Sequence, residues 1–222
     1  AYTVGSYGVA MLIPLGKLIA SVAAATILFV CVIALIASLL TRINFFHVLK
    51  AIKDILFLAF STASSEAALP LAMERLSQLG IRKNIVTFVM PTGYSFNLDG
   101  STLYSSAGIL FIAQLYGIDM SIEQQILVML TLMLSTKGIA GVPGAGIIVV
   151  AATAAAFNLP TDGVAILLGI DRLLDMIRTV CNVCGNCMAT VVVARWEGEL
   201  PKDRFNAAYK ALMSGKQLKD DF

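Results

Sequence analysis

The chain has 222 residues, of which 58% are hydrophobic and only 14% are charged, and its mean hydropathy is +0.85. Soluble domains carry roughly 25% charged residues, so this composition argues against a water-soluble globule. The net charge of +2 gives no basic field for nucleic acid. Ala1 opens the chain without Met and the first apolar run lacks a cleavage pattern, which predicts a fragment without a cleavable signal peptide.

Three apolar segments make up the first half of the chain. A helix needs about 20 residues to cross the hydrocarbon core of a bilayer, and residues 11–41 contain a long uncharged run that predicts such a helix. Residues 45–80 predict a re-entrant hairpin, because apolar arms of roughly 10 to 16 residues, too short to span, flank a small-residue tip at 61–70. Residues 84–116 predict a transmembrane helix that is broken at the polar sequence FNLDG.

The second half of the chain repeats this order. Residues 122–158 predict a second re-entrant hairpin with its tip at 137–146, and residues 162–196 predict a transmembrane helix that carries charged residues. Lys and Arg flank the first hairpin but not the second, so the preference of basic residues for the cytoplasm places the ends of the two hairpins on opposite sides. Residues 198–222 are charged and amphipathic, and predict a cytoplasmic tail.

These segments predict an all-α polytopic membrane protein with an inverted repeat, in which a re-entrant helical hairpin is followed by a broken or polar transmembrane helix. Inverted repeats with discontinuous helices that meet at mid-membrane are typical of secondary transporters. The alternative is a helical bundle with polar kinks and no transport role. We favour the transporter, because ionisable residues inside a membrane are functional by default.

The last membrane helix carries a polar stripe. Five residues fall within an arc of roughly 80° at about 100° per residue: Asp171, Asp175, Arg178, Asn182 and Asn186. A charge at membrane depth costs at least ~2.5 kcal/mol on insertion scales, so the stripe is expected to face a cavity or polar partners. For Asp171 and Arg172, a structural ion pair that holds the bundle together is the alternative.

Three other segments are expected to converge near this stripe and to open their backbones toward it. The tip of the first hairpin offers the Ser64 and Ser65 hydroxyls and a helix N-terminus, which favours an anion. The FNLDG break frees carbonyls beside Asn97 and Asp99 that can coordinate a cation. The tip of the second hairpin has four glycines in nine residues, so its backbone can approach a ligand closely.

Three cysteines of the last helix, Cys181, Cys184 and Cys187, have a spacing seen in iron–sulfur proteins. A fourth ligand is missing, and on a helix the three side chains fan over about 120°. We interpret them as packing residues. We therefore expect no firm metal site, no cofactor, no enzymatic activity and no nucleic-acid partner.

Four motifs together give the chain a family resemblance: SSEAALP, PTGYSFNLDG, KGIAGVPGAG and IDRLLDMIRTVCNVCGN. The chain resembles the dicarboxylate/amino acid:cation symporters, the family of glutamate and aspartate transporters, over roughly residues 15–200. The resemblance implies that residues 1–200 form the carboxyl-terminal part of a transport domain. It also implies a multi-pass protein of the inner membrane, in contact with the lipid bilayer, that is a homotrimer at full length.

The resemblance assigns the two substrate carboxylates to residues of this chain. Arg178, with Ser101 and the backbone near Gly146, matches the site of the side-chain carboxylate, and the planar guanidinium suits a carboxylate bidentately. Ser65 and Asn182 match the contacts of the α-carboxylate.

The resemblance also assigns the substrate ammonium. Asp175, with Thr179 and the carbonyls of Ala63 and Val142, matches the site of the α-amino group. Relatives that carry C4-dicarboxylates resemble this chain but lack this aspartate, since their substrates have no ammonium. The presence of Asp175 beside Arg178 therefore favours aspartate or glutamate.

The coupling ion is expected to differ from that of the sodium-driven relatives. By resemblance, a possible Na⁺ would use Gly93, Asn97, Asp99 and Asn182, together with a carboxylate where this chain has Asn186. A neutral amide at that position weakens a site for a hard cation, which requires oxygen ligands and compensating charge.

A second departure concerns Lys137, whose fixed ammonium could take the electrostatic role of a second sodium ion. Proton-coupled bacterial relatives look like this chain at both positions, so co-transport of H⁺ is favoured, and Asp171 is grouped with the cation-coupling positions. Glu66 is the candidate proton carrier, because burial would favour its neutral form. A permanent pair of Glu66 with Lys137 or Arg178 is an equally weighted alternative.

The expected function is import of acidic amino acids by cation symport, with the second hairpin as the outer gate. The alternatives are a C4-dicarboxylate symporter, a sodium-coupled glutamate/aspartate symporter, an anion channel, and a fragment without transport activity.

Overall fold

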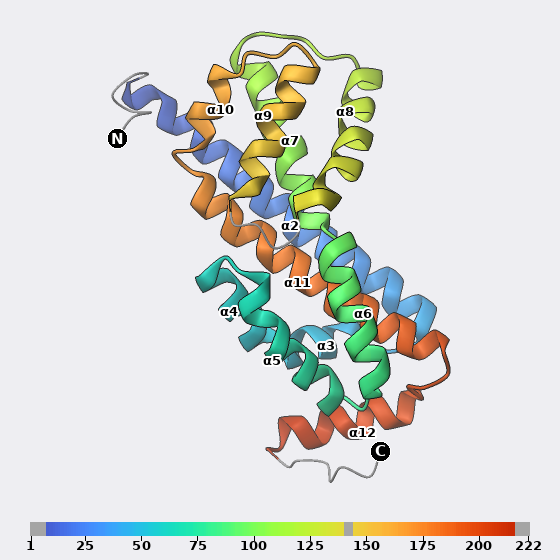
Figure 1. The fold of residues 1–222 in the computed structure, drawn as a ribbon. Coiled ribbons are helices and arrows are strands. Elements are labelled where there is room, and N and C mark those ends of the chain that lie inside the picture. Colours follow the sequence, from blue (N-terminus) through green and yellow to red (C-terminus); the bar gives the residue numbers. More distant parts are fainter. Residues whose placement is uncertain (1–7, 140–143, 216–222) are drawn as a thin grey trace.

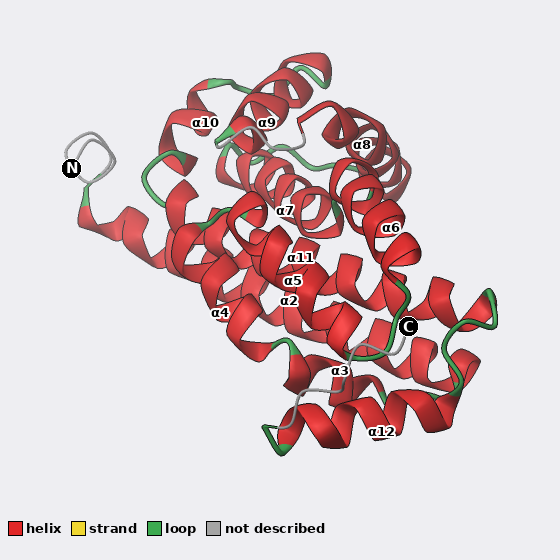
Figure 2. Ribbon diagram, turned by 60° about the horizontal axis from the view of Figure 1, so that its bottom comes forward, coloured by secondary structure: helices red, strands yellow, loops and turns green. Residues whose placement is uncertain are grey.

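The computed structural model describes residues 8–139 and 144–215, and every regular element within these ranges is a helix (Figure 2). The first half contains η1 (Val9–Met11), α2 (Leu12–Thr41), α3 (Phe45–Ala51), α4 (Lys53–Thr62), α5 (Ser65–Gln78) and α6 (Lys83–Phe96). The second half contains α7 (Asp99–Leu115), α8 (Ile122–Ser135), η2 (Thr136–Ile139), α9 (Ala145–Ala156), α10 (Asp162–Leu167), α11 (Asp171–Trp196) and α12 (Lys202–Met213).

Two long helices, α2 and α11, run through the molecule, and the shorter helices gather around their two ends (Figure 1). Helices α3 to α6 and α12 lie toward one end, and α7 to α10 lie toward the other. The segments Val9–Thr41 and Asp171–Trp196 are the two described helices that are long and apolar enough to cross a membrane. Their burial differs: the first is mostly exposed on this chain, and the second is mostly buried.

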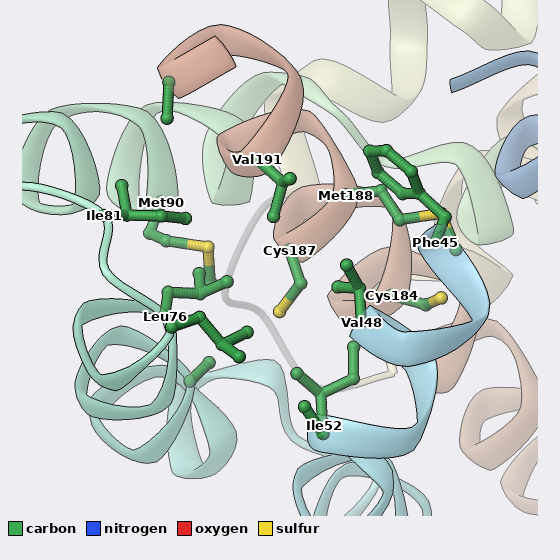
Figure 3. Packing of buried hydrophobic residues seen from close by; sticks show 14 of the residues in the cluster. Phe45, Val48, Ile52, Leu76, Ile81, Met90, Cys184, Cys187, Met188 and Val191 are labelled. Atoms are coloured by element: carbon green, nitrogen blue, oxygen red, sulfur yellow. The ribbon is translucent and has the colours of Figure 1, made fainter. Parts of the chain in front are cut away.

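The two groups of short helices enclose two separate hydrophobic cores. The first joins α3, α5, α6, α11 and α12, with Val48, Leu76, Met90 and Cys187 all 3% exposed or less (Figure 3). The second joins α7, α8, α9 and α10 to the start of α11. Because α2 and α11 contribute side chains to both cores, these two helices connect them.

The three cysteines of α11 are packing residues in this arrangement. Cys184 and Cys187 belong to the first core, and Cys181 is fully buried as well. Figure 3 shows Cys187 among apolar side chains of α3, α5 and α6. Removing a thiol from these positions would leave a small cavity rather than an empty ligand site.

The first hairpin is formed by α4 and α5, which α3 precedes. Its turn consists of two residues, Ala63 in the left-handed conformation and Ser64 in the extended conformation. The Ser64 hydroxyl accepts a hydrogen bond from Ala67 N at 3.2 Å and so caps α5. Helix α5 therefore starts at Ser65, and the tip is narrower than the expected 61–70.

The segment 84–116 forms two helices, α6 and α7, with Asn97 and Leu98 between them. In the segment 122–158, α8 begins at a complete capping box of Ser121 and Gln124, and η2 leads toward the second tip. Residues 140–143 lie outside the described residues, and Val142 is one of them.

The segment 162–196 differs from the expected single helix, because α10 and α11 are separated by residues 168–170. The backbone N–H groups of Gly169 and Ile170 bond to carbonyls three residues back, at 3.2 and 3.0 Å, which tightens the end of α10. Gly169 lowers helix propensity at this point, so the chain turns before α11 begins. The expected polar helix is therefore only α11.

The segment 198–222, expected to be a cytoplasmic tail, contributes the amphipathic helix α12 to the first core. Phe205 is fully buried, and the Tyr209 ring stacks on His47 of α3 with centroids 4.3 Å apart. Arg82 pairs with Glu199 at 2.7 Å, close to the start of this helix. These contacts fix α12 to the base of the first hairpin.

Candidate functional site

The polar stripe of α11 points into the protein. Four of its members are 4 to 6% exposed: Asp175, Arg178, Asn182 and Asn186. Asp171, at the start of the helix, is partly buried. A row of polar side chains buried among packed helices requires polar partners, and each of the other segments supplies one.

An ion pair lies at the centre of the stripe. Arg178 Nε donates to Asp175 Oδ1 at 2.7 Å, one helical turn apart. Arg178 Nη1 is buried and has no hydrogen-bond partner among the described residues. An unpaired N–H of a buried guanidinium is costly, so this atom is well placed to bind an anionic group.

Tyr104 of α7 supports the guanidinium from one side. The Arg178 Cζ atom lies 5.3 Å from the centroid of the Tyr104 ring, a cation–π geometry. The Tyr104 hydroxyl donates to Asp171 Oδ1 at 2.7 Å. Asp171 therefore holds in place the ring against which the Arg178 guanidinium lies.

Helix α9 approaches the same guanidinium through Gly146. A Cβ atom at this position would overlap Arg178 Nη1, so only glycine allows α9 to come this close. The backbone of α9 at Gly146 and the unpaired atom of Arg178 thus face each other.

The break between α6 and α7 is joined to α11 by side-chain bonds. Gly100 N donates to Asn182 Oδ1 at 2.8 Å, and Asn182 Nδ2 donates to the Ser101 hydroxyl at 3.1 Å. Glycine is required here as well, since a Cβ at Gly100 would overlap the Arg178 carbonyl. The amide of Asn182 is thereby engaged on both sides, and Thr179 lies one turn before it, 4% exposed.

The possible cation site lies one turn further along α11. Asn97 Nδ2 donates to Asn186 Oδ1 at 3.2 Å, while Asn97 N bonds to the Gly93 carbonyl at 2.6 Å. A Cβ at Gly185 would lie 2.8 Å from Asp99 Oδ2, so that carboxylate sits against α11. Among the described residues, no group of three or more His, Cys, Asp or Glu is arranged to hold a metal ion.

Lys137 of the second hairpin occupies the end of α6. Its Nζ donates to the Phe96 carbonyl, the last of that helix. The usual partner of this carbonyl would be Gly100 N, which bonds to Asn182 instead. A cation at a helix C-terminus is favourable, so the lysine satisfies the carbonyl that the break exposes.

The tip of the first hairpin is the remaining segment that was expected to lie near the polar stripe of α11. Ser64 and Ser65 lie at the N-terminus of α5, and Ala63 precedes them in the turn. Arg172 Nη2 of α11 donates to the Thr62 carbonyl at 3.1 Å, which connects this tip to the start of the polar helix.

Glu66 is not buried on this chain, although burial was expected of a proton carrier. Its side chain is exposed on this chain, and it interacts with Tyr94 of α6. The ion pair of Arg178 is with Asp175, and the Lys137 ammonium contacts a carbonyl. Within this chain Glu66 is therefore neither buried nor paired with either cation, and its role as proton carrier stays a prediction.

The structure brings most of the expected residues together around α11, with Val142 outside the described residues. The sequence reasoning missed two partners, Tyr104 and the Thr62 carbonyl. Tyr104 lies three residues after Ser101 on the same helix, and a hydroxylated aromatic ring at that spacing is the signal that could have identified it.

The model of the sodium:dicarboxylate symporter family matches residues 1–196. A proton/sodium-glutamate symport protein of Geobacillus stearothermophilus is 50% identical over 91% of this chain and 48% of its own length. The proton/glutamate-aspartate symporter of Escherichia coli (strain K12) is 48% identical over 97% of this chain and 49% of its own length.

A C4-dicarboxylate transport protein of Rhodospirillum rubrum is 44% identical over 98% of this chain and 48% of its own length. The chain thus spans about half the length of the curated relatives it matches. The match extends from residue 1 to the end of α11 and includes every part of the site. The chain belongs to the sodium:dicarboxylate symporter family, a family of transporters rather than enzymes.

Proposed function

We propose that this chain forms the substrate-binding part of a symporter that imports aspartate or glutamate. The observation that carries the proposal is the buried Asp175–Arg178 pair, together with the unpartnered Nη1 atom of Arg178. The two helices long enough to span a membrane and the family membership support a site inside a bilayer.

An acidic amino acid carries charges that match this pair. Its side-chain carboxylate would bind the free edge of Arg178, with Ser101 and the Gly146 backbone beside it. Its ammonium would bind Asp175, with Thr179 and the carbonyls of Ala63 and Val142 as further groups.

Its α-carboxylate would bind Ser65 and Asn182, with the Ser64 hydroxyl nearby. Ser65 is the first residue of α5, and the N-terminus of a helix favours an anion.

Transport of C4-dicarboxylates is the competing function, because relatives with that name match the chain at 44 and 45% identity. A dicarboxylate without an ammonium would place negative charge against Asp175. Two like charges side by side at a buried position repel each other strongly, so the pair selects for a zwitterionic substrate whose ammonium meets Asp175.

The charges around the site favour symport of a cation. Apart from the exposed Glu66, they balance in the chain itself, which supplies three carboxylates, Asp99, Asp171 and Asp175, and three cations, Lys137, Arg172 and Arg178. An acidic amino acid adds a net negative charge, and a charge without compensation is costly at membrane depth. A co-transported cation removes that cost.

We propose that the coupling ion is a proton. Lys137 already places a positive charge at the break, and Asn186 replaces a carboxylate with an amide. Relatives are named as proton symporters and as proton/sodium symporters, so sodium coupling is the alternative. Sodium would then use Gly93, Asn97, Asp99 and Asn182.

In the proposed mechanism, α8 and α9 form the outer gate. The tip would close over the substrate when its charges and those of the cation are balanced, and the domain would then move as a body. The complete protein is proposed to be an inner-membrane homotrimer with α12 on the cytoplasmic side, since Lys and Arg flank the first hairpin.

The test is uptake of labelled aspartate by the complete gene product in proteoliposomes, with unlabelled glutamate or succinate as competitor. Glutamate should compete at concentrations at least about tenfold below those of succinate. Asp175→Ser should reverse this order, because it removes the partner of the ammonium. The matched control is Asp162→Ser, at the exposed start of α10, which should leave the order unchanged. Strong succinate competition in the unmodified protein would refute the assignment.

A further inference from the structure

The first turn of α11 contains two adjacent charged residues with different partners. Asp171 accepts from the Tyr104 hydroxyl of α7, at 2.7 Å. Arg172 donates from Nη2 to the Thr62 carbonyl of α4, at 3.1 Å. The sequence leaves a mutual pair of these two residues open, but each of them instead reaches a segment on another side of the site.

Thr62 is the residue at which the first hairpin turns. Its carbonyl belongs to the last turn of α4, where carbonyls lack partners within the helix and a nearby cation is favourable. Its hydroxyl accepts from Ser64 N at 3.2 Å and donates to the Leu58 carbonyl at 2.8 Å. Arg172 therefore binds Thr62, the residue whose hydroxyl accepts a hydrogen bond from the Ser64 backbone.

The turn itself needs external support. Ala63 has φ +50° and ψ +38°, the left-handed conformation that a residue with a Cβ adopts at a cost of roughly 1 kcal/mol or more. Ser64 then begins α5 through its bond with Ala67 N. A small change in this turn would rotate Ser64 and the start of α5 relative to α11.

We propose that Arg172 is a positioning residue that sets the tip of the first hairpin at the correct distance from Asp175 and Arg178. This rests on the proposed function, because the tip matters to transport only if its serines contact the substrate. Asp171 acts on the opposite wall, through Tyr104 and its cation–π contact with Arg178. The first turn of α11 thus contacts the segments on two sides of the site, α4 through Arg172 and α7 through Asp171.

The first measurement is aspartate uptake by the complete gene product carrying Arg172→Ala, Arg172→Gln or Arg172→Lys. Loss of a charge-assisted hydrogen bond predicts a KM raised about tenfold by the alanine variant, with Vmax within about twofold. Lysine should restore most of the affinity, since its ammonium can donate to the same carbonyl. Arg82→Ala is the matched control, as Arg82 is exposed and pairs with Glu199 away from the site.

The second measurement reports on the tip without transport. A nitroxide label is placed at Ser61→Cys in the complete gene product, with Cys31→Ala so that only buried cysteines remain within residues 1–222. It should become more mobile with Arg172→Ala and not with Arg172→Lys. A label at Ser77→Cys should not respond. Both serines are exposed and donate to the carbonyl four residues earlier, but Ser77 lies at the far end of the hairpin.

Unchanged label mobility with Arg172→Ala would overturn the proposal, as would greater mobility with an unchanged KM. If the alanine variant does not fold, Arg172→Gln decides by the same two readouts. If aspartate proves not to be a substrate, the label still tests whether Arg172 holds the tip, so this failure can be told apart from failure of the proposed function.

Discussion

At the scale of single residues, glycines decide how closely the backbone approaches the ion pair. Gly146 faces Arg178 Nη1, and Gly100 faces the Arg178 carbonyl. Both glycines are helical, where glycine is less favourable than alanine by about 0.5–1 kcal/mol. Glycine at these two positions therefore provides room around Arg178 at the expense of helix stability.

Gly146→Ala is expected to weaken binding of the acidic substrate at least about tenfold, because the new methyl group displaces the guanidinium. The same change should not lower thermal stability much, since alanine favours the helix. Isothermal titration of the purified protein with aspartate measures the affinity.

The matched control is Gly16→Ala, in α2, where a Cβ would meet no atom within 4 Å. It should leave affinity unchanged and raise stability slightly. Equal affinities of the two alanine variants would contradict the role assigned to Gly146.

The residue scale also shows what the sequence can predict. The buried stripe followed from its helical spacing alone, which is a local property. The partners of Asp171 and Arg172 did not, because Tyr104 and Thr62 lie 67 and 110 residues away in the chain. Only the packing of α7 and α4 against α11 brings them together, and spacing along one helix carries no information about that.

At the scale of elements, α12 turns a charged tail into part of the first core. Phe205 and Leu200 are fully buried, and Ala208 is 1% exposed. The stacked rings of His47 and Tyr209 extend the contact to α3. This helix holds the base of the first hairpin, whose other end carries the substrate-binding serines.

Phe205→Ala is expected to cost about 3–5 kcal/mol of stability, because it empties a fully buried site. For a chain of this size that corresponds to a fall of roughly 6 °C or more in Tm. The measurement is the temperature at which the monodisperse peak is lost in size-exclusion chromatography after heating. Phe88→Ala, at a side chain 71% exposed on α6, is the matched control and should change Tm by less than about 2 °C. A similar fall in both variants would show that α12 does not stabilise the fold.

Element boundaries show a second limit of sequence reasoning. The break at Asn97 and Leu98 was predictable from the polar sequence inside an apolar run. The turn at 168–170 was not, because the segment reads as apolar and the single Gly169 is compatible with a helix. The segment 198–222 was expected to be a charged, amphipathic tail, yet the apolar face of α12 packs against α3. Composition does not reveal that contact.

At the scale of the whole molecule, α2 and α11 contribute side chains to both cores, and the polar site lies along α11. Apart from the exposed Glu66, the charges of the site are balanced within the chain, so the net charge of the site depends on the charges of the substrate and ion that bind. Lys137 is central to this balance, because it places a positive charge at the break, where it donates to the last carbonyl of α6. The identity of the coupling ion should therefore change when this balance is changed.

In the unmodified protein, an inwardly directed proton gradient should drive aspartate uptake when no sodium is present. Lys137→Met combined with Asn186→Asp removes one positive charge and adds one negative charge at the break. When no sodium is present, uptake by the double variant should be at least about tenfold lower than uptake by the unmodified protein, because the uncompensated charge opposes closure. Uptake should recover when sodium supplies the missing cation. The measurement is initial-rate uptake in proteoliposomes with the pH and sodium gradients imposed separately.

Lys83→Met combined with Asn84→Asp makes the same change of charge at the exposed start of α6 and is the matched control. It should keep the ion dependence of the unmodified protein, since an exposed charge is hydrated and needs no added ion. Strict sodium dependence of the unmodified protein would contradict proton coupling. A double variant that still needs no sodium would contradict the role of Lys137, because the break would then hold its charge without either cation.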